Sequence, residues 1–109
     1  GALSVDHLEF TGEEEISALL GSQTMPTILP GAAFFLGMNY PPARRMIDAG
    51  LGVAIASDFN PGSSPSGNLK FIVSLACIKL QPVSSLEFIP YAYGTSLTAG
   101  LVLGGRKVL

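Results

Sequence analysis

The sequence contains little charge, one cysteine and one histidine. Charged residues make up 13% of its 109 residues, about half the usual share of a globular chain, while 48% are hydrophobic. Its six basic and eight acidic residues do not form the clustered basic surface that nucleic acid requires, so we expect no nucleic-acid partner. The single cysteine, Cys77, excludes an internal disulfide framework and a zinc module built from several cysteines, and it indicates a reducing, cytoplasmic location.

Long hydrophobic runs are also missing. None approaches the roughly 18 residues that a membrane span needs, so we expect no membrane partner. The mean hydropathy of +0.46 is nevertheless high for so short a chain, whose surface fraction must be large. Some of this apolar surface should therefore face a partner, either in a homo-oligomer or within a larger protein.

The first 80 residues alternate apolar runs with helical patterns. Strands are predicted at residues 3–8, 25–29 and 53–56, and helices at residues 12–20, 43–49 and 68–80. Uniformly apolar strands that alternate with helices favour an α/β fold with a parallel sheet. The spacing of Thr11 and Glu14 predicts a capping box in which Thr11 caps the first helix. Residues 32–40 show no clean period and are predicted to form a loop with one helical turn at most.

Residues 81–109 have a different character. Pro82, Pro90 and two tyrosines interrupt any helical pattern, and two apolar runs flank Gly104-Gly105. Such runs around a Gly-Gly pair predict an antiparallel β-hairpin. We therefore expect one unit over residues 1–80 and a separate tail segment over residues 81–109.

Candidate functional residues follow two of the predicted strands. His7 stands at the end of the first strand and Asp58 follows the third, and parallel sheets bind ligands at the carboxyl ends of their strands. The loop from Asp58 to Pro65 could orient a polar substrate with backbone N–H groups beside a carboxylate. It could equally be a capped turn in which Asn60 and Ser63 bond their own backbone. A lone histidine such as His7 can likewise be purely structural.

Three segments read VDHLE at residues 5–9, LPGAAFFL at residues 29–36 and AIASDFNPGSSP at residues 54–65. Together they resemble imidazolonepropionase, a metal-dependent cyclic amidohydrolase of histidine degradation. Residues 85–94 also resemble the C-terminal end of that family. The resemblance implies a partial (β/α)8 TIM barrel, strands six to eight with their helices, followed by C-terminal strands of a small β-sandwich.

The resemblance also implies an activity and a set of site residues. Family members open the cyclic amide of 4-imidazolone-5-propanoate, giving N-formimidoyl-L-glutamate, with zinc or iron as the cofactor. By resemblance, Asp58 is a metal ligand that helps deprotonate the attacking water, and His7 is a catalytic residue that hydrogen-bonds the developing oxyanion. Asn60, Gly62 and Ser63 match the loop that binds the imidazolone substrate.

The sequence departs from the family pattern in its metal ligands. The His-x-His pair of barrel strand one and the histidine of strand five are absent, and His7 is the only histidine. Zinc normally takes three or four protein ligands, so we expect this chain by itself to bind no metal tightly and to be inactive. The alternatives are another cyclic amidohydrolase and a non-catalytic α/β module that binds a partner or self-associates.

Overall fold

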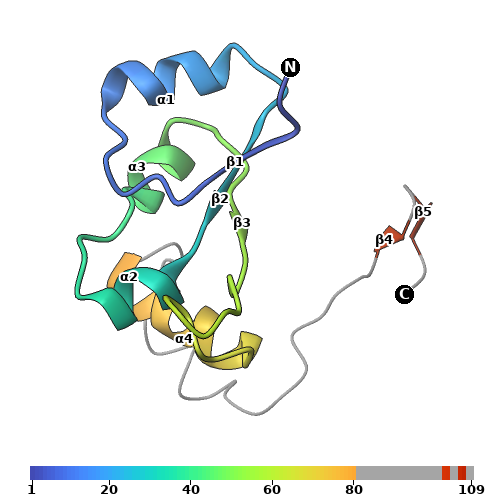
Figure 1. Cartoon of the computed structure of the whole chain (residues 1–109). Helices are drawn as coiled ribbons and strands as arrows, with labels where there is room; N and C mark the ends of the chain where they lie inside the picture. The colour runs from blue at the N-terminus through green and yellow to red at the C-terminus, as the bar shows by residue number, and fades with distance from the viewer. Residues whose placement is uncertain (81–101, 104–105, 108–109) are drawn as a thin grey trace.

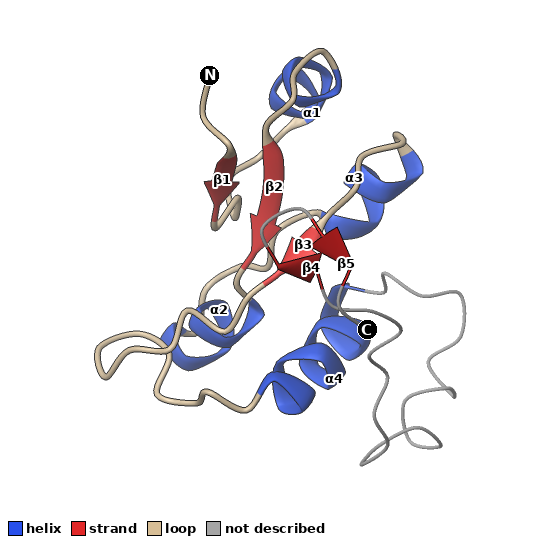
Figure 2. Ribbon diagram, turned by 90° about the vertical axis from the view of Figure 1, so that its right-hand side faces the viewer, coloured by secondary structure: helices blue, strands red, loops and turns tan. Residues whose placement is uncertain are grey.

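Three short strands pair in parallel, in the order in which they occur along the chain (Figures 1 and 2). The structure is a computed structural model that describes residues 1–80, 102–103 and 106–107. Its sheet has the order β1-β2-β3, with β1 at Ser4–Asp6, β2 at Met25–Ile28 and β3 at Ala54–Ile55. The predicted parallel α/β arrangement is therefore confirmed.

Helices follow each of these strands, and a hairpin lies near the end of the chain. The helices are α1 (Glu13–Leu20), α2 (Pro30–Leu36), α3 (Ala43–Asp48) and α4 (Leu69–Leu80). Strands β4 (Val102–Leu103) and β5 (Arg106–Lys107) pair in antiparallel fashion, which confirms the hairpin predicted around Gly104-Gly105. Residues 81–101, on which the predicted boundary and most of the β-sandwich tail fall, lie outside the described residues.

The main core lies on one face of the parallel sheet. Pro26 and Ile28 of β2 are buried, whereas Met25 is 46% exposed and Thr27 is partly exposed, so the two faces of this strand differ. The buried cluster joins β2 to three helices, and its members are Ile16, Ile28, Ala43, Met46, Ala76 and Leu80. Helices α2 and α4 pack together below the carboxyl end of β2 (Figure 1). Among the described elements, helix packing thus buries one face of β2 far more than the other.

Helix α1 begins one residue later than the sequence predicted. Gly12, and not Thr11, is the N-cap, and its backbone N–H donates to Glu15 Oε2 at 2.8 Å. Hydrogen bonds from the backbone N–H groups of Glu15 and Gly12 hold the pKa of the Glu15 carboxyl below its usual value. The reciprocal side-chain cap is missing because glycine has no side chain. The capping box was thus displaced by one residue, with Glu15 in the role expected for Glu14.

Helix α2 begins at Pro30, two residues before the segment in which the sequence predicted a loop with one helical turn at most, and it extends to Leu36. Pro30 stands at its first turn, and Gly37 ends it in the left-handed conformation with φ 66°. Proline at the start and glycine after the end are ordinary helix signals. In the sequence, Pro30 and Gly31 directly follow the predicted strand at residues 25–29 and were interpreted as its end. Gly31 is needed for packing, since an added Cβ would lie 2.7 Å from Ile72 Cδ1 and 2.8 Å from Ser64 Oγ.

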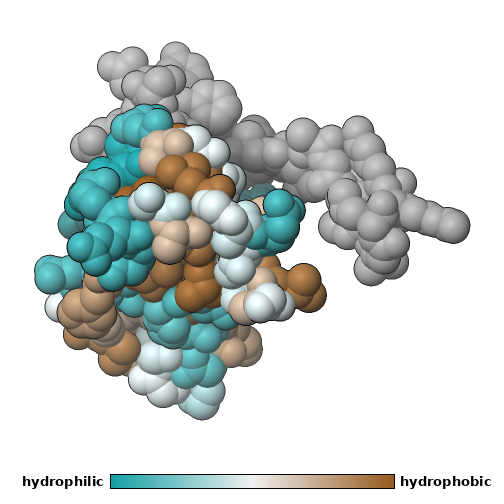
Figure 3. Space-filling model, turned by 90° about the horizontal axis from the view of Figure 1, so that it is seen from above, coloured by the Kyte–Doolittle hydropathy of each residue, from teal (hydrophilic) through white to brown (hydrophobic). Residues whose placement is uncertain are grey.

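Large hydrophobic side chains remain exposed around this small core. In the view from above, hydrophobic residues lie among hydrophilic ones on the open surface (Figure 3). Among the described residues, the exposed large hydrophobic side chains include Leu3, Phe10 and Phe59, at 90%, 89% and 68% exposure. Within the described ranges, the structure contains no helix with the length and apolar character of a membrane span. The high mean hydropathy therefore corresponds to apolar surface that the described residues leave uncovered.

The close packing at Gly31 predicts that a larger side chain there will destabilise the fold. Ile72 is fully buried, and the Ser64 hydroxyl is held by a hydrogen bond, so neither neighbour can move away easily. We expect Gly31→Val to lower the free energy of unfolding by about 1–3 kcal/mol, measured by chemical denaturation. Gly52→Val is the matched control, because a Cβ at Gly52 meets nothing within 4 Å. Equal stability of the two variants would contradict the proposed packing.

Candidate functional site

The carboxyl edge of the sheet gathers the segments that carry His7 and Asp58. His7 directly follows β1, and Asp58 follows β3. Because the strands are parallel, both segments leave the sheet at the same edge, with β2 between them. Over the part of the chain that the structure describes, no hydrogen bond or ion pair joins His7 to Asp58. The two predicted residues therefore share an edge of the sheet without direct bonding.

Asp58 sits at a sharp change in backbone direction. Its φ of 50° is in the left-handed region, which few residues other than glycine adopt and which aspartate tolerates better than most. Its carbonyl oxygen accepts a hydrogen bond from Asn60 Nδ2 at 2.7 Å, and its Oδ2 lies 3.5 Å from Ser63 Oγ. The loop thus holds this carboxylate at the strand end beside a hydroxyl group.

Asn60 organises the loop that follows Asp58. Its Oδ1 accepts hydrogen bonds from the backbone N–H groups of Gly62 at 2.9 Å and Ser63 at 2.8 Å, and its Nδ2 donates to Ser63 Oγ at 2.8 Å. This is the capped turn that the sequence allowed as one of two interpretations. A substrate that uses the same N–H groups must therefore share them with Asn60 Oδ1 or displace it.

Ser64 connects this loop to the end of β3. Its hydroxyl donates to the Ser57 carbonyl oxygen at 2.6 Å, and the residue is 1% exposed. Its backbone pairs with Asn60 through N–O contacts of 2.9 and 3.3 Å. Ser64 was not predicted from the sequence, because nothing in the Ser63-Ser64 pair distinguishes the buried serine from the one facing the candidate site.

His7 lies in an unusual turn at the end of β1. His7 and Leu8 both have positive φ values, 75° and 71°, and the turn is closed by a 3.2 Å hydrogen bond from the Thr11 N–H to the Leu8 carbonyl. The turn brings Glu9 back to the histidine, with His7 Nδ1 3.2 Å from Glu9 Oε1. Glu9 was not predicted as a site residue. A carboxylate two residues after a candidate histidine was the signal that could have found it.

A metal ion needs more ligands than the described residues bring together. They contain no group of three or more His, Cys, Asp or Glu side chains placed to hold a metal. A catalytic zinc site normally has three protein ligands and an open position. Asp58 therefore fits at most one position of such a site, and the described part of the chain does not form a metal centre by itself.

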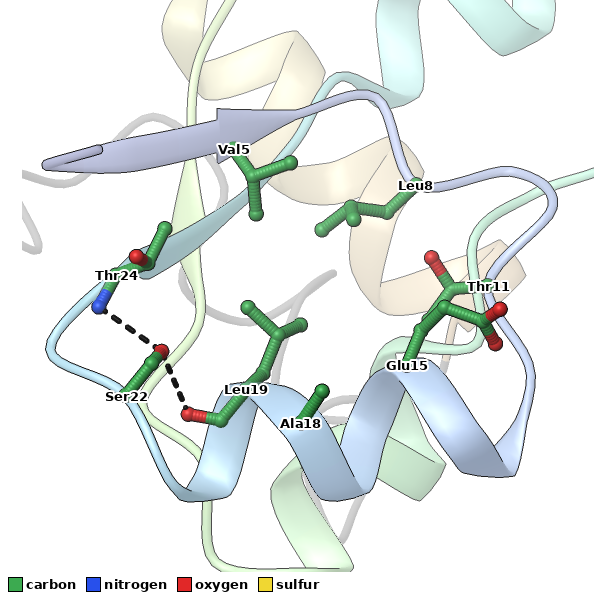
Figure 4. A pocket seen from close by; sticks show the side chains of 8 residues that line it. All are labelled: Val5, Leu8, Thr11, Glu15, Ala18, Leu19, Ser22 and Thr24. Atoms are coloured by element: carbon green, nitrogen blue, oxygen red, sulfur yellow. Dashed lines mark hydrogen bonds between the residues drawn. The ribbon is translucent and has the colours of Figure 1, made fainter. Parts of the chain in front are cut away.

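A hollow of about 370 Å³ lies between β1 and α1 (Figure 4). Its lining residues are Val5, Leu8, Thr11, Glu15, Ala18, Leu19, Ser22 and Thr24. None of the five predicted site residues lines it, and its one carboxylate, Glu15, already accepts the Gly12 N–H. This hollow therefore does not carry the predicted chemistry.

Cys77 lies away from the candidate site, on α4. It is 5% exposed, and burial raises the pKa of its thiol. Because the thiolate is the reactive form of cysteine, this environment disfavours a nucleophilic role. Cys77 thus packs as a small buried apolar residue.

Comparisons with known proteins identify close relatives of this chain. No protein-family model matches it. The imidazolonepropionase of Flavobacterium johnsoniae is 50% identical over 97% of the chain, and that of Flavobacterium psychrophilum is 47% identical over 97%. The imidazolonepropionase of Bacillus velezensis is 42% identical over 96% of the chain.

The matches cover nearly all of this chain but a minor part of each relative. The chain spans 27% of the length of each of these three proteins. The segments that carry the resemblance, residues 5–9, 29–36 and 54–65, lie at or beside the strands of the parallel sheet. By sequence identity over nearly its whole length, the chain belongs to the imidazolonepropionase family.

Proposed function

We propose that this chain forms the C-terminal part of an imidazolonepropionase and contributes one side of its active site. The observation that carries the proposal is the 50% identity to the Flavobacterium johnsoniae protein over 97% of the chain. The position of His7 and Asp58 at one edge of the sheet supports it, because ligands of parallel sheets bind at the carboxyl ends of the strands.

Residues 1–80 are proposed to be strands six to eight of a (β/α)8 barrel with their helices. The consecutive strand order β1-β2-β3 supports this assignment, because neighbouring strands of such a barrel follow one another in the chain. So does the unequal burial of the two faces of β2, since a barrel covers its outer face with helices and its inner face with other strands. Residues 81–109 are proposed to belong to a small β-sandwich.

The proposed reaction is hydrolysis of the cyclic amide of 4-imidazolone-5-propanoate. Water adds to the ring carbonyl, the ring C–N bond breaks and the departing nitrogen takes up a proton, which yields N-formimidoyl-L-glutamate. Asp58 accepts the proton of the attacking water, and His7 hydrogen-bonds the oxygen on which negative charge develops. Asn60, Gly62 and Ser63 bind the imidazolone ring beside Asp58.

The family's cofactor, zinc or iron, would take Asp58 as one of its ligands. Such a metal polarises a carbonyl and makes water more acidic. The remaining ligands would come from parts of the protein other than the described residues, which contain no further candidate set. The isolated chain is accordingly proposed to be inactive, and the full-length protein to act in the cytoplasm.

A non-catalytic module that self-associates is the second candidate function. The exposed side chains of Leu3, Phe10 and Phe59 favour association of some kind. The rest of a barrel would cover apolar surface of this kind equally well. Identity to enzymes over nearly the whole chain therefore favours the hydrolase, and association as a homo-oligomer is compatible with it.

The role proposed for Asp58 predicts a large loss of turnover when its charge is removed. In the full-length enzyme that carries this segment, we expect Asp58→Asn to lower kcat for ring opening about 100- to 10,000-fold, because an amide does not take up the proton. Asp48→Asn is the matched control, since Asp48 lies on α3 and pairs with Arg44. Normal turnover by Asp58→Asn would rule out this role.

The hydrogen bonds of Asn60 predict a separate effect on substrate binding. Asn60→Ala removes the side chain that orders the Gly62–Ser63 turn and that is itself proposed to bind the ring, so we expect KM to rise about tenfold, as for the loss of a hydrogen bond or two. Asn68→Ala is the matched control. The Asn68 side chain lies directly before α4 and accepts a hydrogen bond from the Phe71 N–H. This variant should lower stability and leave KM unchanged. A rise in KM in both variants alike would contradict a local role for Asn60.

A further inference from the structure

Glu9 is a carboxylate that the proposed reaction does not use. Its side chain is 4% exposed, whereas the side chain of His7 is 50% exposed. Burial of a carboxylate is costly unless a donor compensates it, and His7 Nδ1 lies 3.2 Å from Glu9 Oε1. The buried member of this pair is thus the carboxylate, and the histidine that it contacts faces outward.

The backbone holds the two side chains in this relation. Positive φ values at His7 and Leu8 fold the chain back directly after β1, so that a residue only two positions away reaches the imidazole ring. Left-handed conformations at two successive residues other than glycine are unfavourable, and they persist only where the surrounding structure enforces them. The Thr11 N–H closes the turn on the Leu8 carbonyl.

The contact determines which ring nitrogen remains available. An ionised carboxylate only accepts hydrogen bonds, so the nitrogen that faces Glu9 must carry a proton. With that proton on Nδ1, Nε2 is the nitrogen left to act on a ligand. It accepts a hydrogen bond in the neutral ring and donates one when the ring carries its second proton.

We infer that Glu9 is a positioning residue for His7: it fixes the proton on Nδ1 and turns Nε2 toward the carboxyl edge where the substrate binds. This inference rests on the function proposed above. It adds a condition to the role of His7, because donation to the developing oxyanion through Nε2 requires the doubly protonated ring. Glu9 acts through the histidine and does not touch the substrate.

Two variants of Glu9 separate hydrogen bonding from mere filling of space. Glu9→Gln keeps an acceptor oxygen for Nδ1, whereas Glu9→Met keeps a similar volume and removes the acceptor. In the full-length enzyme labelled with ¹⁵N-histidine, protonated and bare ring nitrogens give well-separated NMR signals, and the His7 signals are assigned by their loss in His7→Asn. We expect Nδ1 protonation to persist in Glu9→Gln and to fall in Glu9→Met, where the proton is shared between the two ring nitrogens.

We expect the two Glu9 variants to differ in activity in the same sense as in Nδ1 protonation. We expect kcat/KM for ring opening to fall about 10- to 100-fold in Glu9→Met, the size typical of losing a carboxylate that orients a functional histidine, and to fall less in Glu9→Gln. Glu14→Met, on the exposed first turn of α1, is the control and should leave both the ring signals and the activity unchanged.

The NMR result and the activity test different claims. Unchanged Nδ1 protonation in Glu9→Met overturns the inference, whatever the activity. Loss of Nδ1 protonation without any change in kcat/KM also overturns it, because the positioning then has no consequence. A wild-type enzyme that holds the proton on Nδ1 but does not open the imidazolone ring contradicts the proposed function, while the pairing of Glu9 with His7 stands.

Discussion

Parallel hydrogen bonding between β1, β2 and β3 brings the carboxyl ends of all three strands to one edge of the sheet. Every candidate functional residue of this chain depends on that arrangement. His7 and the loop that begins at Asp58 are about 50 residues apart in sequence, a separation that only the pairing of their strands with β2 overcomes. An antiparallel pairing of either outer strand would place its end at the opposite edge and separate the two candidate groups.

The same sheet explains why so hydrophobic a chain exposes so much apolar surface. Parallel sheets occur almost only where both faces are covered. Here the helices bury Pro26 and Ile28 on one face of β2. On the other face Met25 is exposed to solvent and Thr27 is partly exposed. The chain spans 27% of the length of the three relatives named above, and the rest of a barrel would supply the missing cover under the proposed assignment.

Much of the fold was predictable from the sequence, because apolar runs and helix-end signals are local. The parallel strands, α1, α3, α4 and the hairpin at Gly104-Gly105 were all expected from such patterns. Helix α2 was not, because Gly31 weakens the helical signal and is explained only by its contact with Ile72 and Ser64. Packing between distant segments leaves no trace in a local pattern.

In the candidate site, too, some features were predictable from the sequence and others were not. The alternation of strands and helices predicted that His7 and Asp58 lie at strand ends. The family resemblance supplied the roles proposed for these two residues. The partners of these residues were not predictable in this way. Glu9 reaches His7 only because two residues take left-handed conformations, and Ser64 is distinguished from Ser63 only by its burial and its hydrogen bond to the Ser57 carbonyl.

The central claim is that this chain supplies the carboxyl-edge part of an imidazolonepropionase active site. It is tested most directly by replacing the matching 27% of the Flavobacterium johnsoniae enzyme with this chain and measuring imidazolone ring opening. We expect a folded chimera that turns over 4-imidazolone-5-propanoate. A chimera that folds and takes up metal as the natural enzyme does, yet has no ring-opening activity, would contradict it.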